Sequence, residues 1–84
     1  MENVVGNYGM YVDVFVEVFE LNDKSGAEKL KFHAIPEWDS LGHMKLIASL
    51  EKAFGIRFGM EDIMAFSSFE DGVKILERNG VALR

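Results

Sequence analysis

The 84-residue sequence contains no cysteine. Disulfide bonds and thiolate zinc sites are therefore excluded as sources of stability, and side-chain packing must hold the fold alone. No apolar run approaches the ~18 residues of a membrane span, and residues 1–5 lack the basic and apolar regions of a secretory leader. We expect a soluble, cytoplasmic protein without a membrane span.

Positive charge is also scarce. The 9 Lys and Arg residues are outnumbered by 14 Asp and Glu residues, for a formal net charge of −5. Such a chain repels polyanions, and its cations form no basic stripe, so we expect no nucleic-acid partner. The excess of acid lies in residues 1–40, because residues 41–84 carry equal numbers of acids and bases.

The length and composition favour one compact domain over residues 1–84. The chain is 49% hydrophobic and 27% charged, which is typical of neither a disordered nor a membrane protein. A domain of this size has a net stability of only roughly 3 to 5 kcal/mol. We expect it to be a monomer.

Residues 8–21 combine strand-favouring composition with helical spacing. β-Branched and aromatic residues dominate the segment, which favours a strand. However, Asp13, Glu17 and Glu20 are spaced four and three residues apart and therefore share one helical face. We predict a helix on this basis. Its apolar face contains Val12, Phe15, Val16 and Phe19.

Residues 22–39 are predicted to form a long loop, because they hold the only proline, Pro36, and several turn-favouring residues. The loop has too many apolar residues for a free linker, and we expect these residues to fix it to the core. They are Leu30, Phe32, Ile35 and Trp38.

Residues 40–54 show the strongest helical pattern, with apolar residues at three- and four-residue steps and a C-cap candidate at Gly55. A short helix is predicted over residues 60–66, and a last helix over residues 69–79 begins after a capping residue, Ser68. The expected fold class is therefore all-α: a bundle of three main helices plus one short helix, with a long loop between the first two. The core face of the last helix contains Phe69, Val73 and Leu76.

Ser40 lies where the long loop meets the helix predicted over residues 40–54. The unpaired N–H groups and the positive dipole end at a helix N-terminus stabilise a phosphate, so a serine there can carry a phosphodiester. Asp and Ser are also among the best N-cap residues. Asp39 and Ser40 alone therefore indicate no more than a helix cap.

The features that follow Ser40 give it a further meaning by their order. Asp39-Ser40-Leu41, the apolar helix ending at Gly55, the short acidic helix and the last helix capped by Ser68 resemble the acyl carrier protein family, over roughly residues 8 to 80. The resemblance implies a four-helix bundle in which Ser40 receives 4′-phosphopantetheine from coenzyme A. A separate Mg²⁺-dependent phosphopantetheinyl transferase attaches this arm, whose thiol then holds a cargo as a thioester.

The same resemblance implies roles for other residues. Asp39 matches an aspartate that helps to position the metal and diphosphate in the transferase, and Leu41 matches an apolar residue used for packing or partner contact. In the family, cargo can enter between the second and third helices. Because Phe58 and Phe66 are bulkier than the aliphatic residues often found there, we expect a filled interior suited to a short or polar cargo. The matching positions are His43, Leu46, Leu50, Phe58, Ile63 and Phe66.

The helix over residues 40–54 departs from the family in its charge. Carriers of fatty-acid synthesis present an acidic second helix to basic partner surfaces. This helix carries a net charge of +1, with Gly42 and Lys45 where that pattern has acids. We therefore expect a specialised carrier with a dedicated loading ligase and a downstream transferase or synthase. Gly42 either permits a close approach of a partner, adds local mobility beside the arm, or is neutral.

Two alternatives to an acyl carrier remain open. An aminoacyl or peptidyl carrier would use the same serine, although Asp39 argues mildly against a peptidyl carrier. A small helical interaction module would leave Ser40 unmodified.

An enzyme is the least supported class, because no nucleophile is paired with a base at readable spacing. His43 is expected to be a surface residue without a catalytic role. His33 and His43 share no metal-ligand spacing. We therefore expect no catalytic residues and no metal site.

Overall fold

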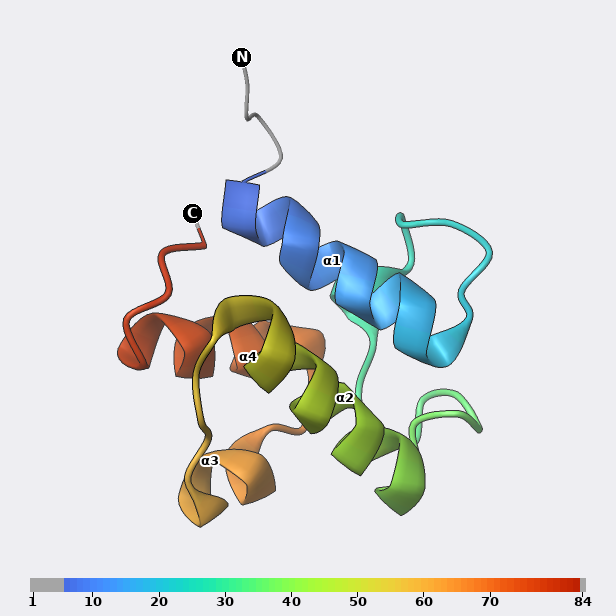
Figure 1. Ribbon diagram of the computed structural model, residues 1–84. Coiled ribbons are helices and arrows are strands. Elements are labelled where there is room, and N and C mark those ends of the chain that lie inside the picture. Colours follow the sequence, from blue (N-terminus) through green and yellow to red (C-terminus); the bar gives the residue numbers. More distant parts are fainter. Residues whose placement is uncertain (1–5, 84) are drawn as a thin grey trace.

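The computed structural model describes residues 6–83, and within this range the chain forms an all-α bundle. α1 packs against α2, and the single 3₁₀ turn η1 contacts both α1 and α4. Figure 1 shows α4 crossing behind α2, while the short α3 lies below α4 and to one side of the lower half of α2. This architecture confirms the predicted fold class. The elements are α1 (Gly6–Phe19), η1 (Ala27–Lys29), α2 (Ser40–Phe54), α3 (Met60–Ala65) and α4 (Phe69–Arg78).

The first helix forms despite its strand-favouring composition because its apolar stripe is buried. Val12, Phe15 and Phe19 are all at most 8% exposed. The helix ends at Phe19 rather than at residue 21, because Glu20 adopts a left-handed φ of 54°. The N–H of Leu21 then donates to the carbonyl of Val16 at 3.0 Å, which closes the helix end.

The second helix covers the range that its apolar spacing predicts, and both of its ends are capped. A carboxylate oxygen of Asp39 accepts a hydrogen bond from the N–H of Gly42 at 2.8 Å. Gly55 adopts a left-handed φ of 65°, and the N–H of Ile56 donates to the carbonyl of Glu51 at 3.1 Å. The start of α2 is therefore fixed by its own sequence.

The last two helices end one residue before their predicted limits, α3 at Ala65 and α4 at Arg78. The hydroxyl of Ser68 accepts from the N–H of Asp71 at 3.0 Å, as the capping pattern predicts. Beyond α4, Gly80 has a φ of 91° and allows the closing bond from Val81 to α4. The predicted core face of α4 is confirmed as buried: Phe69, Val73 and Leu76.

Aromatic rings fill the space between α1, α4 and the long loop. The Phe15 ring centroid lies 5.0 Å from those of Tyr11 and Phe69 and 5.5 Å from that of Trp38. The Tyr11 hydroxyl donates to the Phe69 carbonyl at 2.7 Å, and burial raises the pKa of this phenol. A Cβ at Gly72 would lie 2.0 Å from the Tyr11 oxygen, so this helical position requires glycine.

The long loop is fixed to the core, as its apolar residues predict. Trp38 is 0% exposed. The N–H of Phe32 donates to the Ser67 carbonyl, and the N–H of Phe69 donates to the Leu30 carbonyl, each at 2.9 Å. These two bonds tie the loop to the connection between α3 and α4. The sequence did not predict the turn η1 within the loop.

The length and hydropathy of the helices bear on membrane association. Over residues 6–83, no helix is both long enough and apolar enough to cross a membrane.

Candidate functional site

Ser40 is the first residue of α2, and its side chain is exposed. Asp39, the N-cap residue, places its carboxylate at the same helix end through its bond to the N–H of Gly42. Among residues 6–83, no base forms a hydrogen bond with the Ser40 hydroxyl. The hydroxyl is therefore available to an incoming group, and the helix dipole favours a negative charge there.

Two residues hold this helix start rigidly against the loop. Trp38 packs against Phe19, with the ring centroids 5.2 Å apart. Gly42 is buried, and a Cβ at this position would lie only 1.9 Å from the backbone carbonyl oxygen of Glu37. Gly42 therefore allows the loop to approach α2 closely within this chain. This finding replaces the expectations that Gly42 permits the approach of a partner, adds mobility or is neutral.

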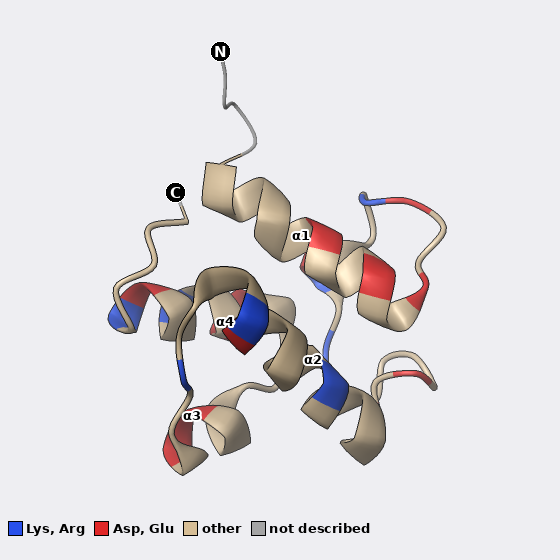
Figure 2. Ribbon diagram, viewed as in Figure 1, with Lys and Arg blue, Asp and Glu red and all other residues tan. Residues whose placement is uncertain are grey.

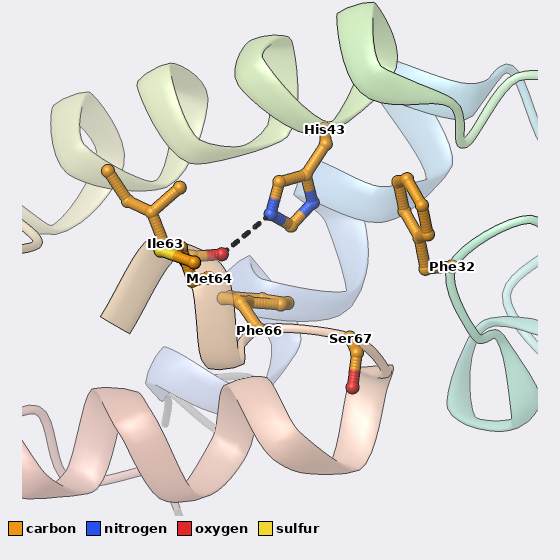
Figure 3. Close-up of a pocket in the computed structure, with 6 residues that line it drawn as sticks. All are labelled: Phe32, His43, Ile63, Met64, Phe66 and Ser67. Atoms are coloured by element: carbon orange, nitrogen blue, oxygen red, sulfur yellow. Dashed lines mark hydrogen bonds between the residues drawn. The ribbon is translucent and has the colours of Figure 1, made fainter. Parts of the chain in front are cut away.

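A shallow apolar pocket opens between α2 and α3. Its volume is about 200 Å³. His43 contributes one wall, and because it follows Ser40 by three residues on α2, the two side chains project from the same side of the helix. The residues around the pocket are Phe32, His43, Ile63, Met64, Phe66 and Ser67 (Figure 3).

The structure brings only some of the expected cargo-lining residues to this pocket. His43, Ile63 and Phe66 line it. Leu46 and Leu50 are 0% exposed and Phe58 is 7% exposed, and all three belong to the packed core instead.

The sequence prediction missed three lining residues, Phe32, Met64 and Ser67. Phe32 belongs to the loop, and its place at the pocket depends on the backbone bond to Ser67, for which a single sequence carries no signal.

His43 is half-buried, so its expected place at the surface is wrong. Its Nδ1 atom accepts a hydrogen bond from Nε1 of Trp38 at 3.0 Å, and its Nε2 atom lies 2.9 Å from the Ile63 carbonyl oxygen. Two aromatic rings, those of Phe32 and Phe66, meet the imidazole edge to face. The imidazole therefore stabilises the fold through its hydrogen bonds and ring contacts.

Large apolar side chains are exposed on α2, within the first turns after Ser40, and on α3. Leu41 is 66% exposed, Met44 is 53% exposed, Met60 is 70% exposed and Met64 is 77% exposed. This set of four residues is called the methionine surface below. Exposure of several large apolar residues near one another is typical of an interaction site.

Two of the three acids on α2 and α3 are bonded within the chain, whereas Glu61 is exposed. An oxygen of Glu51 accepts from the N–H of Phe58 at 2.9 Å. Asp62 accepts from the side chains of Asn79 and Arg78, and these bonds lower the pKa of its carboxyl group. Figure 2 shows blue, basic positions along α2, and the two lysines of this helix, Lys45 and Lys52, are exposed. The surface therefore has no row of free acids.

A comparison with protein families identifies this region. The family described as phosphopantetheine attachment site matches residues 37–76. No curated protein and no solved structure matches the chain. The match begins in the loop before Trp38 and covers α2, α3 and most of α4. It therefore includes Ser40, the methionine surface and every pocket residue except Phe32.

The residues at the start of α2 fit the 4′-phosphopantetheine that this family carries as a covalent group. An exposed hydroxyl at a helix N-terminus can accept a phosphodiester without displacing a packed side chain, and the neighbouring pocket is apolar. Over residues 6–83, no cluster of three or more acidic, His or Cys side chains could hold a metal ion. The match to the phosphopantetheine attachment site over residues 37–76 is consistent with a member of the acyl carrier protein family.

Proposed function

We propose that the chain is an acyl carrier whose 4′-phosphopantetheine arm is attached to the hydroxyl of Ser40. The observation that carries this proposal is the exposed Ser40 hydroxyl at the capped N-terminus of α2, inside the matched family region. The arm's thiol holds the cargo as a thioester and presents it to other enzymes.

Attachment requires a separate phosphopantetheinyl transferase and coenzyme A. The Ser40 oxygen bonds to the phosphorus that bears the pantetheine, the bond from that phosphorus to the remaining nucleotide phosphate breaks, and the serine proton leaves to a base of the transferase. The new phosphodiester is anionic, and the N-terminus of α2 stabilises it. Asp39, beside Ser40, is the residue we assign to the transferase's Mg²⁺.

We assign a short acyl group as the cargo. The pocket beside Ser40 has a volume of about 200 Å³, below the ~300 Å³ at which pockets begin to bury drug-sized ligands. Behind it, Phe66 is 1% exposed, and Leu46 and Leu50 are fully buried, so a long chain has no vacant interior to occupy. The apolar lining favours an acyl over a charged aminoacyl cargo.

The partner enzymes in this proposal are a dedicated loading ligase and a downstream transferase or synthase that dock on the methionine surface. Fatty-acid enzymes with basic patches would find few free acids there, because Glu51 and Asp62 are bonded within the chain. Lys45 and Lys52 are exposed on α2, so we expect a partner surface with an apolar centre and carboxylates around it.

We assign the chain no catalytic activity of its own. Ser40 has no hydrogen-bonded base among the described residues, and both ring nitrogens of His43 have partners within the fold. The chemistry is supplied by the partner enzymes.

The test is covalent loading followed by intact mass measurement. The protein is incubated with coenzyme A, Mg²⁺ and a broad-specificity phosphopantetheinyl transferase. The wild type should gain the mass of one phosphopantetheine, Ser40→Ala should gain none, and the matched control Ser49→Ala on the same helix should load like the wild type. Absence of a Ser40-dependent gain would contradict the proposal and favour the unmodified interaction module.

A further inference from the structure

The hydrogen bonds of His43 define the state of its ring. The indole N–H of Trp38 can only donate, so the Nδ1 atom of His43 must be an unprotonated acceptor. The ring hydrogen then lies on Nε2, which donates to the Ile63 carbonyl oxygen at 2.9 Å. A single neutral imidazole thus joins the long loop, α2 and α3 (Figure 3).

Neighbouring rings leave the imidazole little freedom to turn. The rings of Phe32 and Phe66 lie 5.6 and 5.9 Å away, each at an interplanar angle of 77°. The Trp38 ring stacks on the imidazole at 6.2 Å and 17°. With three rings around it and a bond at each nitrogen, His43 is held in one orientation at the edge of the pocket.

The helix that His43 contacts has little other attachment to α2. No residue of α3 is fully buried, and of its residues only Ile63 packs against the hydrophobic core, so apolar packing attaches this helix weakly. Within residues 6–83, the bond from His43 to Ile63 is the one hydrogen bond between the side chains of α2 and the residues of α3. Asp62 bonds to Arg78 and Asn79, and therefore ties α3 to the end of α4 instead.

We propose that His43 is a specificity-determining latch: its bond to the Ile63 carbonyl holds α3 against α2 and keeps an acyl chain out of the interior. This proposal rests on the proposed attachment of the arm to Ser40. An acyl group that extends inward from the pocket meets the Phe66 side chain first. Beyond Phe66, Leu46 and Leu50 lie in the packed core. To pass, it must separate α3 from α2, which leaves the Ile63 carbonyl without its partner.

The length of the His43 side chain offers a matched pair of variants. The amide nitrogen of His43→Gln reaches as far as the imidazole Nε2 and can still donate to the Ile63 carbonyl. The oxygen of His43→Asn reaches only as far as Nδ1, so this variant keeps an acceptor for Trp38 and loses the bond to α3. Ser49→Ala, on the same helix but not among the residues that line the pocket, is the control.

The experiment loads each protein from octanoyl-coenzyme A with a broad-specificity transferase and records methyl NMR spectra. Wild type, His43→Gln and Ser49→Ala should show no shift of the Leu46 and Leu50 methyl groups relative to the acetyl-loaded proteins. His43→Asn should show clear shifts of both. Octanoyl-induced shifts that are as large in the wild type as in His43→Asn, or that are absent from His43→Asn, would overturn the latch.

A second measurement tests the latch without any arm. Amide hydrogen exchange of α3 in the unloaded proteins should be about fivefold or more faster in His43→Asn than in His43→Gln, because one net hydrogen bond is lost. Equal exchange in the two variants would contradict the latch even if Ser40 loads normally. Conversely, a failure of Ser40 to load would contradict the proposed function. The hydrogen-exchange comparison would still test the latch, because it uses proteins without the arm.

Discussion

The two sides of α2 are held by different kinds of interaction. Toward α1 and the loop, α2 borders a closed aromatic interior built around Phe15 and Trp38, both 0% exposed. Toward α3 it contacts a helix with no buried residue, through the hydrogen bond of His43 to Ile63. The first side therefore determines whether the chain folds, whereas the second can change at little cost to the whole. In the proposed function, the cargo and the partner enzymes meet the protein on the second side.

The largest expected effect comes from removing one aromatic ring from the interior between α2, α1 and the loop, which we call the closed side; the side toward α3 is called the open side. Phe15→Ala should destabilise the protein by about 3 to 5 kcal/mol, which is comparable to the whole stability of a domain this small. We expect a largely unfolded protein by circular dichroism. Met64→Ala, on the open side and 77% exposed in the wild type, should change the free energy of unfolding by less than about 0.5 kcal/mol. Equal losses in urea titrations would remove the contrast.

A smaller effect is expected where the loop meets α2. Gly42→Ala places a methyl group 1.9 Å from the Glu37 carbonyl oxygen, so the backbone must shift, at a cost of about 1 to 3 kcal/mol. Gly26 has a φ of −86° and no heavy atom within 4 Å of a Cβ, so Gly26→Ala should be neutral or slightly stabilising. Urea unfolding of both variants makes the comparison. A Gly42→Ala protein as stable as the wild type would show that the loop yields easily.

Two variants of Asp39, the N-cap residue of α2, separate its role as a helix cap from the role in loading that we propose for it. Asp39→Ala should cost about 1 kcal/mol of stability, whereas Asp39→Asn keeps a capping oxygen and should cost almost nothing. Both should be loaded more slowly by the transferase, because both lack the carboxylate assigned to Mg²⁺. Thermal unfolding and the time course of mass gain give the two readouts. Normal loading of Asp39→Asn would contradict that assignment.

The smallest effect concerns the attachment of α3 to α4. Hydrogen bonds from Asn79 and Arg78 lower the pKa of Asp62 below its ordinary value of 3.8. Because the folded-state pKa is the lower one, the stabilisation is fully present above the unfolded-state pKa and is lost as the pH falls through the folded-state value.

Amide NMR shifts of α3 should therefore change only as the pH falls below about 4, because the folded-state pKa of Asp62 lies under its ordinary value. The effect should be small because the Arg78 side chain is 63% exposed. The Asp62→Asn variant should lack this acid-dependent change, and its persistence there would assign the titration to another carboxyl group.

The sequence predicted the elements better than the contacts between them. The range of α2 follows from apolar spacing and from Gly55, which are local signals. The end of α1 was missed, because Glu20 is an unusual residue for a left-handed helix end. Local pattern also identified Ser40 as a helix start, and the order of the later helices pointed to its family.

The pocket depends on contacts that a local pattern does not contain. His43 is twenty residues from the carbonyl it binds, and nothing in the spacing of the two residues indicates that pairing. The same holds for the close approach of the Glu37 carbonyl to Gly42, which depends on the path of the loop. Such pairings become visible only when the three-dimensional arrangement is known.

The burial of Trp38, two residues before Ser40, has a mechanical consequence. Because this ring is 0% exposed and is stacked on Phe19, the chain enters α2 from a fixed point. An arm on Ser40 would swing about a stationary pivot, and the region its thiol can sweep is set by the arm's own length. A partner enzyme must therefore bring its catalytic centre within that radius, since the carrier itself cannot extend to meet it.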